Sequence, residues 1–204
     1  PIRTSAPAIQ LAQYLPELAE QAHHLTLIRS MVTREGNHAR ARYLMHTGYA
    51  PTNSISHPTF PSILADELGA ENFDLPNAVT INSPAFDAAF LGAENDPFYV
   101  PEPTTGVQNL SYPMGMYQGR FRARMDMLSF LNREFAQRTS QQVLAHDAIY
   151  GKADRMIHSP LTEAFDLSEE PDALREAYGM NDFGQGCLMA RRLVEVGVAA
   201  VEVS

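Results

Sequence analysis

The prediction of the fold begins with residues 25–48, which read LTLIRSMVTREGNHARARYLMHTG. The apolar pair at residues 27–28 is short enough for a buried strand. Residues 32–38 have the polar, glycine-containing composition of a loop, and residues 39–45 are rich in Ala, Arg, Leu and Met, which favour a helix. Gly48 follows at the position where glycine commonly ends a helix. The stretch therefore predicts a strand, a loop and a helix.

The loop and the start of the predicted helix carry four polar residues: Asn37, His38, Arg40 and Arg42. In open α/β sheets, ligands bind beyond the carboxyl ends of the strands, where such a loop is expected to lie. Arg42 follows His38 by about one helical turn, so their side chains are expected on the same face. A guanidinium beside an imidazole suits a sulfate, phosphate or carboxylate oxyanion. We therefore predict His38 and Arg42 as catalytic residues and Asn37 and Arg40 as anion-binding residues.

A purely structural interpretation of the same four residues stays open. Asn37 and His38 would then cap the helix, and Arg40 and Arg42 would face solvent. His46 lies two turns after His38 but is rotated by about 80° around the helix axis. The two histidines are therefore not expected to share one metal ion, and the stretch leaves the metal ligands unknown.

The composition narrows the classes of function. The chain has 204 residues and a net charge of −9, which argues against a nucleic-acid-binding protein. The only cysteine, Cys187, excludes an internal disulfide and a zinc site made of several cysteines. It is expected to be a buried structural residue rather than a nucleophile. Because no run of about 18 apolar residues is present, no membrane-spanning helix is expected.

Apolar spacing and capping residues predict the remaining elements within a single domain. Helices are expected at residues 15–23, 60–68, 121–135, 141–150, 168–178 and 186–195, and strands at residues 78–81 and 198–203. The first strand, the helix after it and the strand at 78–81 suggest a right-handed crossover. Residues 82–119, rich in proline and glycine, are expected to form a loop-rich excursion that covers the strand ends.

Several separated strings resemble one bacterial protein family. LTLIRSM, NHARARYLMHTG, FLGAENDPF, AFDLSEEPDALREAYG and CLMARRLVEVGVAAVEVS occur in the order found in the family of domain of unknown function 1501. The resemblance covers nearly the whole chain. It implies the fold of the alkaline-phosphatase and sulfatase superfamily, in which helices flank a parallel sheet beside one or two metal ions. The fold expected is therefore an α/β alkaline-phosphatase-like core that is incomplete at both ends.

The same resemblance implies a function and a location. This chain would be a fragment of an exported, periplasmic hydrolase that acts on sulfate or phosphate esters, with a small molecule or a glycan as substrate. The parent protein would use a divalent metal (Ca²⁺, Mn²⁺ or Zn²⁺), held mainly by segments before and after these residues. The chain begins without Met or a signal peptide. Sheet edges left open in a fragment predict marginal stability or self-association.

The stretch at residues 38–48 also resembles a sulfatase motif, Cys/Ser-x-Pro-Ser-Arg, which leads into a helix ending in Thr-Gly. Counted back from Thr47 and Gly48, His38 takes the nucleophile position and Arg42 that of the arginine. Because position 38 is neither Cys nor Ser, no formylglycine can form there, and the usual sulfatase mechanism is not expected. The alternative function is a non-catalytic module that binds glycans or anions, with aromatic residues of the 82–119 segment stacking on sugars.

Overall fold

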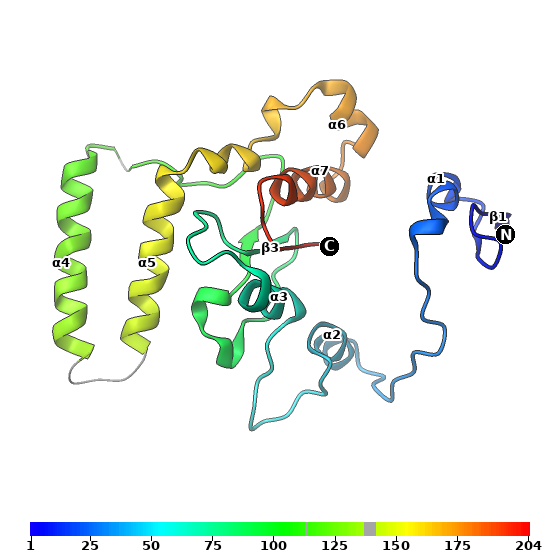
Figure 1. The fold of residues 1–204 in the computed structure, drawn as a ribbon, viewed down its shortest axis with the longest axis horizontal. Helices are drawn as coiled ribbons and strands as arrows, with labels where there is room; N and C mark the ends of the chain where they lie inside the picture. The colour runs from blue at the N-terminus through cyan, green and yellow to red at the C-terminus, as the bar shows by residue number, and fades with distance from the viewer. Residues whose placement is uncertain (113, 137–141) are drawn as a thin grey trace. The chain divides into compact units, whose positions relative to one another are not determined.

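The computed structural model describes residues 1–112, 114–136 and 142–204 (Figure 1). These residues form two compact units, residues 1–36 and residues 37–204. The expectation of a single partial domain over residues 1–204 stays a prediction.

The first unit is a small hairpin packed on a short helix. Strands β1 (Ile2–Arg3) and β2 (Gln10–Leu11) pair in antiparallel orientation. Helix α1 (Pro16–Glu20) and the 3-10 turn η1 (Ala22–His24) follow, with Ala19 and Ala22 buried. The helix predicted at residues 15–23 therefore exists as a short α-helix with a 3-10 turn after it.

The strand predicted at residues 27–28 is wrong. Residues 25–36 contain neither helix nor strand, and the side chains of Leu27 and Ile28 are 46% and 67% exposed. Two apolar residues bury little surface unless a neighbouring strand pairs with them, and none of the described strands does so. The crossover predicted from this strand is therefore wrong as well.

The helix that follows is confirmed. Helix α2 spans His38–Thr47, and Gly48 ends it with a left-handed φ of 77°, a conformation that glycine adopts at no steric cost. Helix α3 (Phe60–Leu68) is also confirmed, with Thr59 at its N-cap position and a proline in its first turn.

The second unit is built on a three-stranded parallel sheet in the order β4-β3-β5. The predicted strands are confirmed as β3 (Ala78–Ile81) and β5 (Ala200–Val203). Strand β4 (Phe98–Val100) was not predicted and lies within residues 82–119. With helices on the sheet, the expected α/β class with a helix-flanked parallel sheet is confirmed.

The other described elements connect the strands. The 3-10 helices η2 (Ala89–Leu91) and η3 (Ala93–Asn95) lie between β3 and β4. Between β4 and β5 lie α4 (Gln118–Ala136), α5 (Gln142–His158), η4 (Pro160–Phe165), η5 (Leu167–Glu169), α6 (Asp172–Tyr178) and α7 (Asp182–Glu195). Helix α5 was expected to end before Gly151. It continues to His158 because the cost of one interior glycine, about 1 kcal/mol, does not stop a helix that good helix formers continue.

Helices α3 and α7 cover opposite faces of the sheet (Figure 1). Because side chains alternate along a strand, Val79 and Ile81 face the core that contains Leu188 of α7. Ala78, from the same strand, packs with Ala65 of α3. The main core therefore lies between the sheet and α7, and Glu202, next to Val201 and Val203, belongs to the face opposite that core.

Candidate functional site

Polar side chains meet at the carboxyl ends of β3 and β5. Arg42 and His46 come from α2, Ser83 follows β3, and Glu202 is the third residue of β5. We call these four residues the carboxyl-edge cluster. In open α/β sheets this edge is where ligands bind, so the cluster is the candidate site.

Arg42 ties α2 to the loop after β3. Its Nη2 donates hydrogen bonds to Ser83 Oγ at 3.0 Å and to the Pro84 carbonyl oxygen at 2.9 Å. The guanidinium carbon also lies 5.6 Å from the centre of the Phe86 ring, within the range of a cation–π contact. The guanidinium is therefore held in one place, at the end of a core strand.

His46 forms a pair with Glu202 on the same side of the sheet. His46 Nδ1 lies 3.3 Å from Glu202 Oε2, and the two side chains are 23% and 20% exposed. An ionised carboxylate only accepts hydrogen bonds, so the proton of the neutral imidazole is assigned to Nδ1. This assignment leaves Nε2 as an acceptor, which is the arrangement by which a carboxylate orients a histidine base.

Asn82 locks the strand ends that carry the cluster. Its Nδ2 donates to the Ser204 carbonyl at 2.9 Å and to the Asp182 carbonyl at 3.1 Å, which joins β3, the end of β5 and the start of α7. The residue adopts a left-handed φ of 71°, which Asn tolerates better than most residues. Its Oδ1 is buried without a hydrogen-bond partner among the described residues, and is thus an acceptor within this edge.

The structure separates the four residues that were predicted from sequence. Asn37 caps α2, because its Oδ1 accepts a hydrogen bond of 3.2 Å from the backbone N–H of Arg40. Arg40 is exposed. His38 is also exposed and forms no hydrogen bond or ion pair with any other described residue. Arg42 is the member of the four that belongs to the carboxyl-edge cluster, and the catalytic and anion-binding roles stay predictions.

The sequence contained weak signals for the residues that were missed. Ser83 comes directly after the strand predicted at residues 78–81, at its carboxyl end. Glu202 is an acid within a β-branched, otherwise apolar strand, where a carboxylate usually has a partner. His46 was considered only as a partner for His38. Its actual partner is distant in sequence, and helical spacing gives no information about it.

Cys187 is less buried than expected, and its structural role stays a prediction. The thiol lies in α7 and is half-buried. Burial raises the pKa of this thiol, which lowers the fraction of reactive thiolate at neutral pH.

A metal site is not built from the described residues. No group of three or more His, Cys, Asp or Glu side chains among them could hold a metal ion, and the pair of His46 and Glu202 alone falls short of the ligand number of protein zinc or calcium sites. The divalent metal stays a prediction for which these residues supply no site. None of the helices in the described ranges is long and apolar enough to cross a membrane.

The fold and the site define an α/β protein with a parallel sheet and a polar cluster at its carboxyl edge. The chain belongs to the DUF1501 family, described as a protein of unknown function, whose family model matches residues 1–204. No curated protein and no solved structure matches the chain.

Proposed function

We propose that this protein is a hydrolase of the alkaline-phosphatase and sulfatase type that acts on sulfate or phosphate esters. The observation that carries the proposal is the hydrogen bond between the Arg42 guanidinium and the Ser83 hydroxyl at the end of β3. The His46–Glu202 pair beside the neighbouring strand supplies a base. An anion-binding cation and an oriented histidine base are groups that can catalyse ester hydrolysis.

Arg42 has donors left for a substrate. Its Nη2 hydrogens are directed to Ser83 and Pro84, while the N–H groups at Nε and Nη1 bind no described residue. A guanidinium presents its N–H groups in a plane that matches two oxygens of a sulfate or phosphate. In the proposal, Arg42 binds the ester oxyanion and neutralises the charge that builds up on its oxygens.

His46 acts as the base in this scheme. Nε2 takes a proton from the attacking water while the water oxygen bonds to sulfur or phosphorus. The ester bond to the alcohol breaks, the leaving oxygen takes a proton from solvent water, and the His46 imidazolium then releases its proton to solvent, which restores the neutral base. Glu202 holds the imidazole and stabilises its positive charge. The divalent metal expected from the resemblance would add positive charge when bound, and the described residues supply no site for it.

Export to the periplasm, an alkaline-phosphatase-like core and a small-molecule or glycan ester as substrate belong to the same proposal. Export and the substrate class are supported by the resemblance of the sequence strings. The alkaline-phosphatase-like core is supported by the same resemblance and by the parallel sheet.

The test is an assay of the full-length protein against 4-nitrophenyl phosphate and 4-nitrophenyl sulfate, with and without Ca²⁺, Mn²⁺ and Zn²⁺. We expect Arg42→Ala and His46→Gln each to reduce kcat/KM by about 100-fold or more, in the range for loss of a general base or an oxyanion-binding group. Arg40→Ala, on the same helix, tests the anion-binding role predicted for Arg40, and full activity in this variant would exclude that role.

His38→Ala decides between the two histidines. Activity retained in His38→Ala and lost in His46→Gln supports the scheme above, and the opposite result makes His38 the base. Absence of turnover with every metal, or full activity in both Arg42→Ala and His46→Gln, would overturn the proposal.

A second candidate function is a non-catalytic glycan-binding module. The observation that favours it is the exposure of Phe90 and Tyr117, aromatic side chains of the 82–119 segment that are each 68% exposed. Aromatic faces of this kind stack on sugar rings. Phe86 is half-buried instead, and its ring packs on Tyr43 and His46. Loss of glycan binding in Phe90→Ala or Tyr117→Ala, without turnover in the wild type, would favour this candidate.

A further inference from the structure

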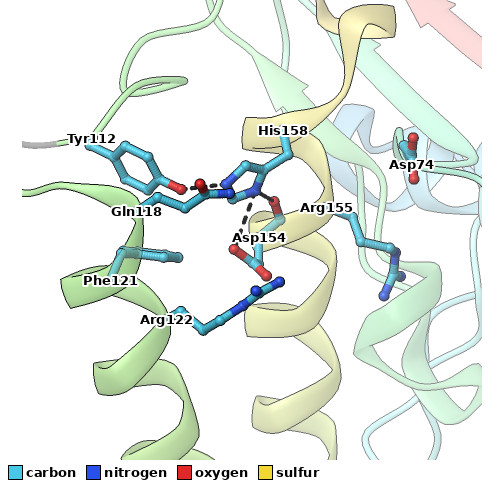
Figure 2. Close-up of a pocket in the computed structure, with 8 residues that line it drawn as sticks. All are labelled: Asp74, Tyr112, Gln118, Phe121, Arg122, Asp154, Arg155 and His158. Atoms are coloured by element: carbon cyan, nitrogen blue, oxygen red, sulfur yellow. Dashed lines mark hydrogen bonds and ion pairs between the residues drawn. The ribbon is translucent and has the colours of Figure 1, made fainter.

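A second polar pocket lies between α4 and α5, away from the residues of the carboxyl-edge cluster. Its volume is about 350 Å³, and it is lined by Asp74, Tyr112, Gln118, Phe121, Arg122, Asp154, Arg155 and His158 (Figure 2). Helix α4 contributes its first turn and α5 contributes its last. The lining combines cations and hydrogen-bonding groups with one apolar aromatic ring.

A chain of hydrogen bonds crosses this pocket. His158 Nδ1 lies 2.7 Å from the Asp154 carbonyl oxygen and 3.4 Å from Asp154 Oδ1. On the other side of the ring, His158 Nε2 is hydrogen-bonded to the Tyr112 hydroxyl. Figure 2 shows the three residues joined in this order across the top of the pocket.

The partners of His158 fix the position of its proton. Both atoms facing Nδ1 are acceptors, so the neutral imidazole carries its proton on Nδ1. Nε2 then accepts, and the Tyr112 hydroxyl donates to it. Asp154 thereby directs one carboxylate oxygen to the imidazole.

Two arginines line the pocket. Arg122 projects from α4 and Arg155 from α5 (Figure 2). Both are exposed, and neither forms a hydrogen bond or an ion pair with another described residue. Asp74 is the remaining acid of the lining. The two acids and the two guanidinium groups of the lining form no ion pair with one another among the described residues, so the guanidinium N–H groups are available to a ligand.

We propose that this pocket binds the oxyanion of a phosphorylated or sulfated small molecule, a site separate from the carboxyl-edge cluster and independent of the function proposed for it. The Arg122 and Arg155 guanidinium groups bind the oxyanion, as guanidinium groups do in phosphate sites. Tyr112 and His158 line the same space as polar partners. Phe121, whose ring centre lies 5.2 Å from that of Tyr112, offers an apolar face to the organic part of the ligand.

Isothermal titration of inorganic phosphate and inorganic sulfate into the protein tests the site. All measurements use Arg42→Ala as the background, so that the carboxyl-edge cluster does not contribute to the signal. We expect binding of at least one anion, weakened about tenfold or more by Arg122→Ala and by Arg155→Ala. The two titrations show which of the anions the pocket prefers.

Arg120→Ala and Arg124→Ala are the matched controls. Both residues lie on α4, as Arg122 does, and neither lines the pocket. Each substitution removes one positive charge, as Arg122→Ala does. We expect each to change the affinity less than twofold. Equal weakening by Arg120→Ala and Arg122→Ala would mean that the anion responds to the overall positive charge and not to this pocket, and would overturn the proposal. Absence of binding of both anions to the background protein would overturn it as well.

The role of the aromatic ring has its own test. Phenyl phosphate should bind more tightly than inorganic phosphate, and Phe121→Ala should remove this advantage while leaving the affinity for inorganic phosphate unchanged. Thermal unfolding of each variant establishes that it is folded. An unchanged preference for phenyl phosphate in Phe121→Ala would overturn the assignment of this ring.

Discussion

At the scale of single residues, Gln185 connects α7 to the preceding segment. The side chain is fully buried. Its Nε2 donates to the carbonyls of Arg175 and Gly179, each at 2.9 Å, and its Oε1 accepts from Arg175 Nε at 3.2 Å. A buried amide with every polar atom engaged stabilises one arrangement of the chain, because any other arrangement leaves buried groups unpaired.

Replacement of Gln185 by Met is therefore expected to destabilise the protein. The variant keeps the volume but leaves two carbonyls and one guanidinium N–H without their partner, at a cost of about 1–3 kcal/mol in the free energy of unfolding. Urea unfolding measures the loss. Gln108→Met, at an exposed position, is the control and should unfold like the wild type. Equal stability of the two variants would show that the buried amide contributes nothing.

Asp166 is expected to make stability depend on pH in acid. Hydrogen bonds from the side chain and backbone of Ser168 hold the pKa of this carboxyl below its ordinary value of 3.8. A carboxyl with a lowered folded pKa stabilises the protein above its unfolded pKa. The contribution is lost as pH falls from about 3.8 through the folded value.

The check is urea unfolding of the wild type and Asp166→Ala from pH 7 to pH 2. The stability difference between them should be constant near neutral pH and should shrink below the ordinary pKa. Ser168→Ala removes the side-chain hydrogen bond and keeps the backbone one, so it should give a smaller effect of the same sign. A difference that does not change over the whole range would rule out this role for Asp166.

At the scale of elements, the elements predicted correctly are those whose residues carry their own signal. Strand β3 was predicted from the run AVTI, and α2 from its helix formers and its terminal Gly48. Strand β4 is only three residues long and lies between two prolines. Three residues show no periodicity, and β4 is a strand because it pairs with β3. Leu27 and Ile28 are the opposite case, because their apolar side chains favour a strand but none of the described strands pairs with them.

At Gly184, the packing of a helix against a turn opposes the helix propensity of the substituted residue. Gly184 lies in the first turn of α7, where an added Cβ would approach the Tyr178 and Gly179 carbonyl oxygens to 2.2 and 2.5 Å. Alanine favours a helix by about 1 kcal/mol over glycine. The overlap is with backbone atoms, which cannot rotate away, so we expect Gly184→Ala to destabilise the protein by about 1–3 kcal/mol.

The matched control is Gly151→Ala in α5. There an added Cβ meets only Arg155 Nη1, at 3.8 Å, so helix propensity alone should decide and the variant should be more stable by about 0.5–1 kcal/mol. Thermal and urea unfolding of both variants provide the comparison. Stabilisation in both would mean that α7 and the Tyr178–Gly179 turn adjust to the extra atom without cost.

At the scale of the whole molecule, the candidate site was only partly predictable. Arg42 was identified because its spacing from Gly48 and its place after a loop are visible in the sequence. The His46–Glu202 pair arises from the approach of a helix near the start of the second unit to a strand at its end. The sequence pattern of neither segment predicts which residue of the other segment it contacts. Ser83 became a candidate only once Arg42 was seen to bond to it.

The division into two units gives the last prediction. Residues 25–36 have neither helix nor strand, and Arg34 lies exposed within them, just before the second unit begins at residue 37. Proteases cut exposed segments that lack regular structure. Limited trypsin digestion should therefore cut first after Arg29 or Arg34 and leave a resistant product, residues 35–204. Arg192 should resist, because it lies in α7 and bonds to Glu170 at 2.5 Å.

Mass spectrometry of a time course identifies the order of cleavage, and thermal unfolding of the purified product tests its independence. The core between the sheet and α7 belongs entirely to the second unit, so the product should keep a cooperative transition near that of the intact chain. Arg34→Gln should shift the first cut to Arg29 without changing that transition. First cuts within α7 or β3, or a product that unfolds without cooperativity, would mean that residues 37–204 depend on the first unit for their stability.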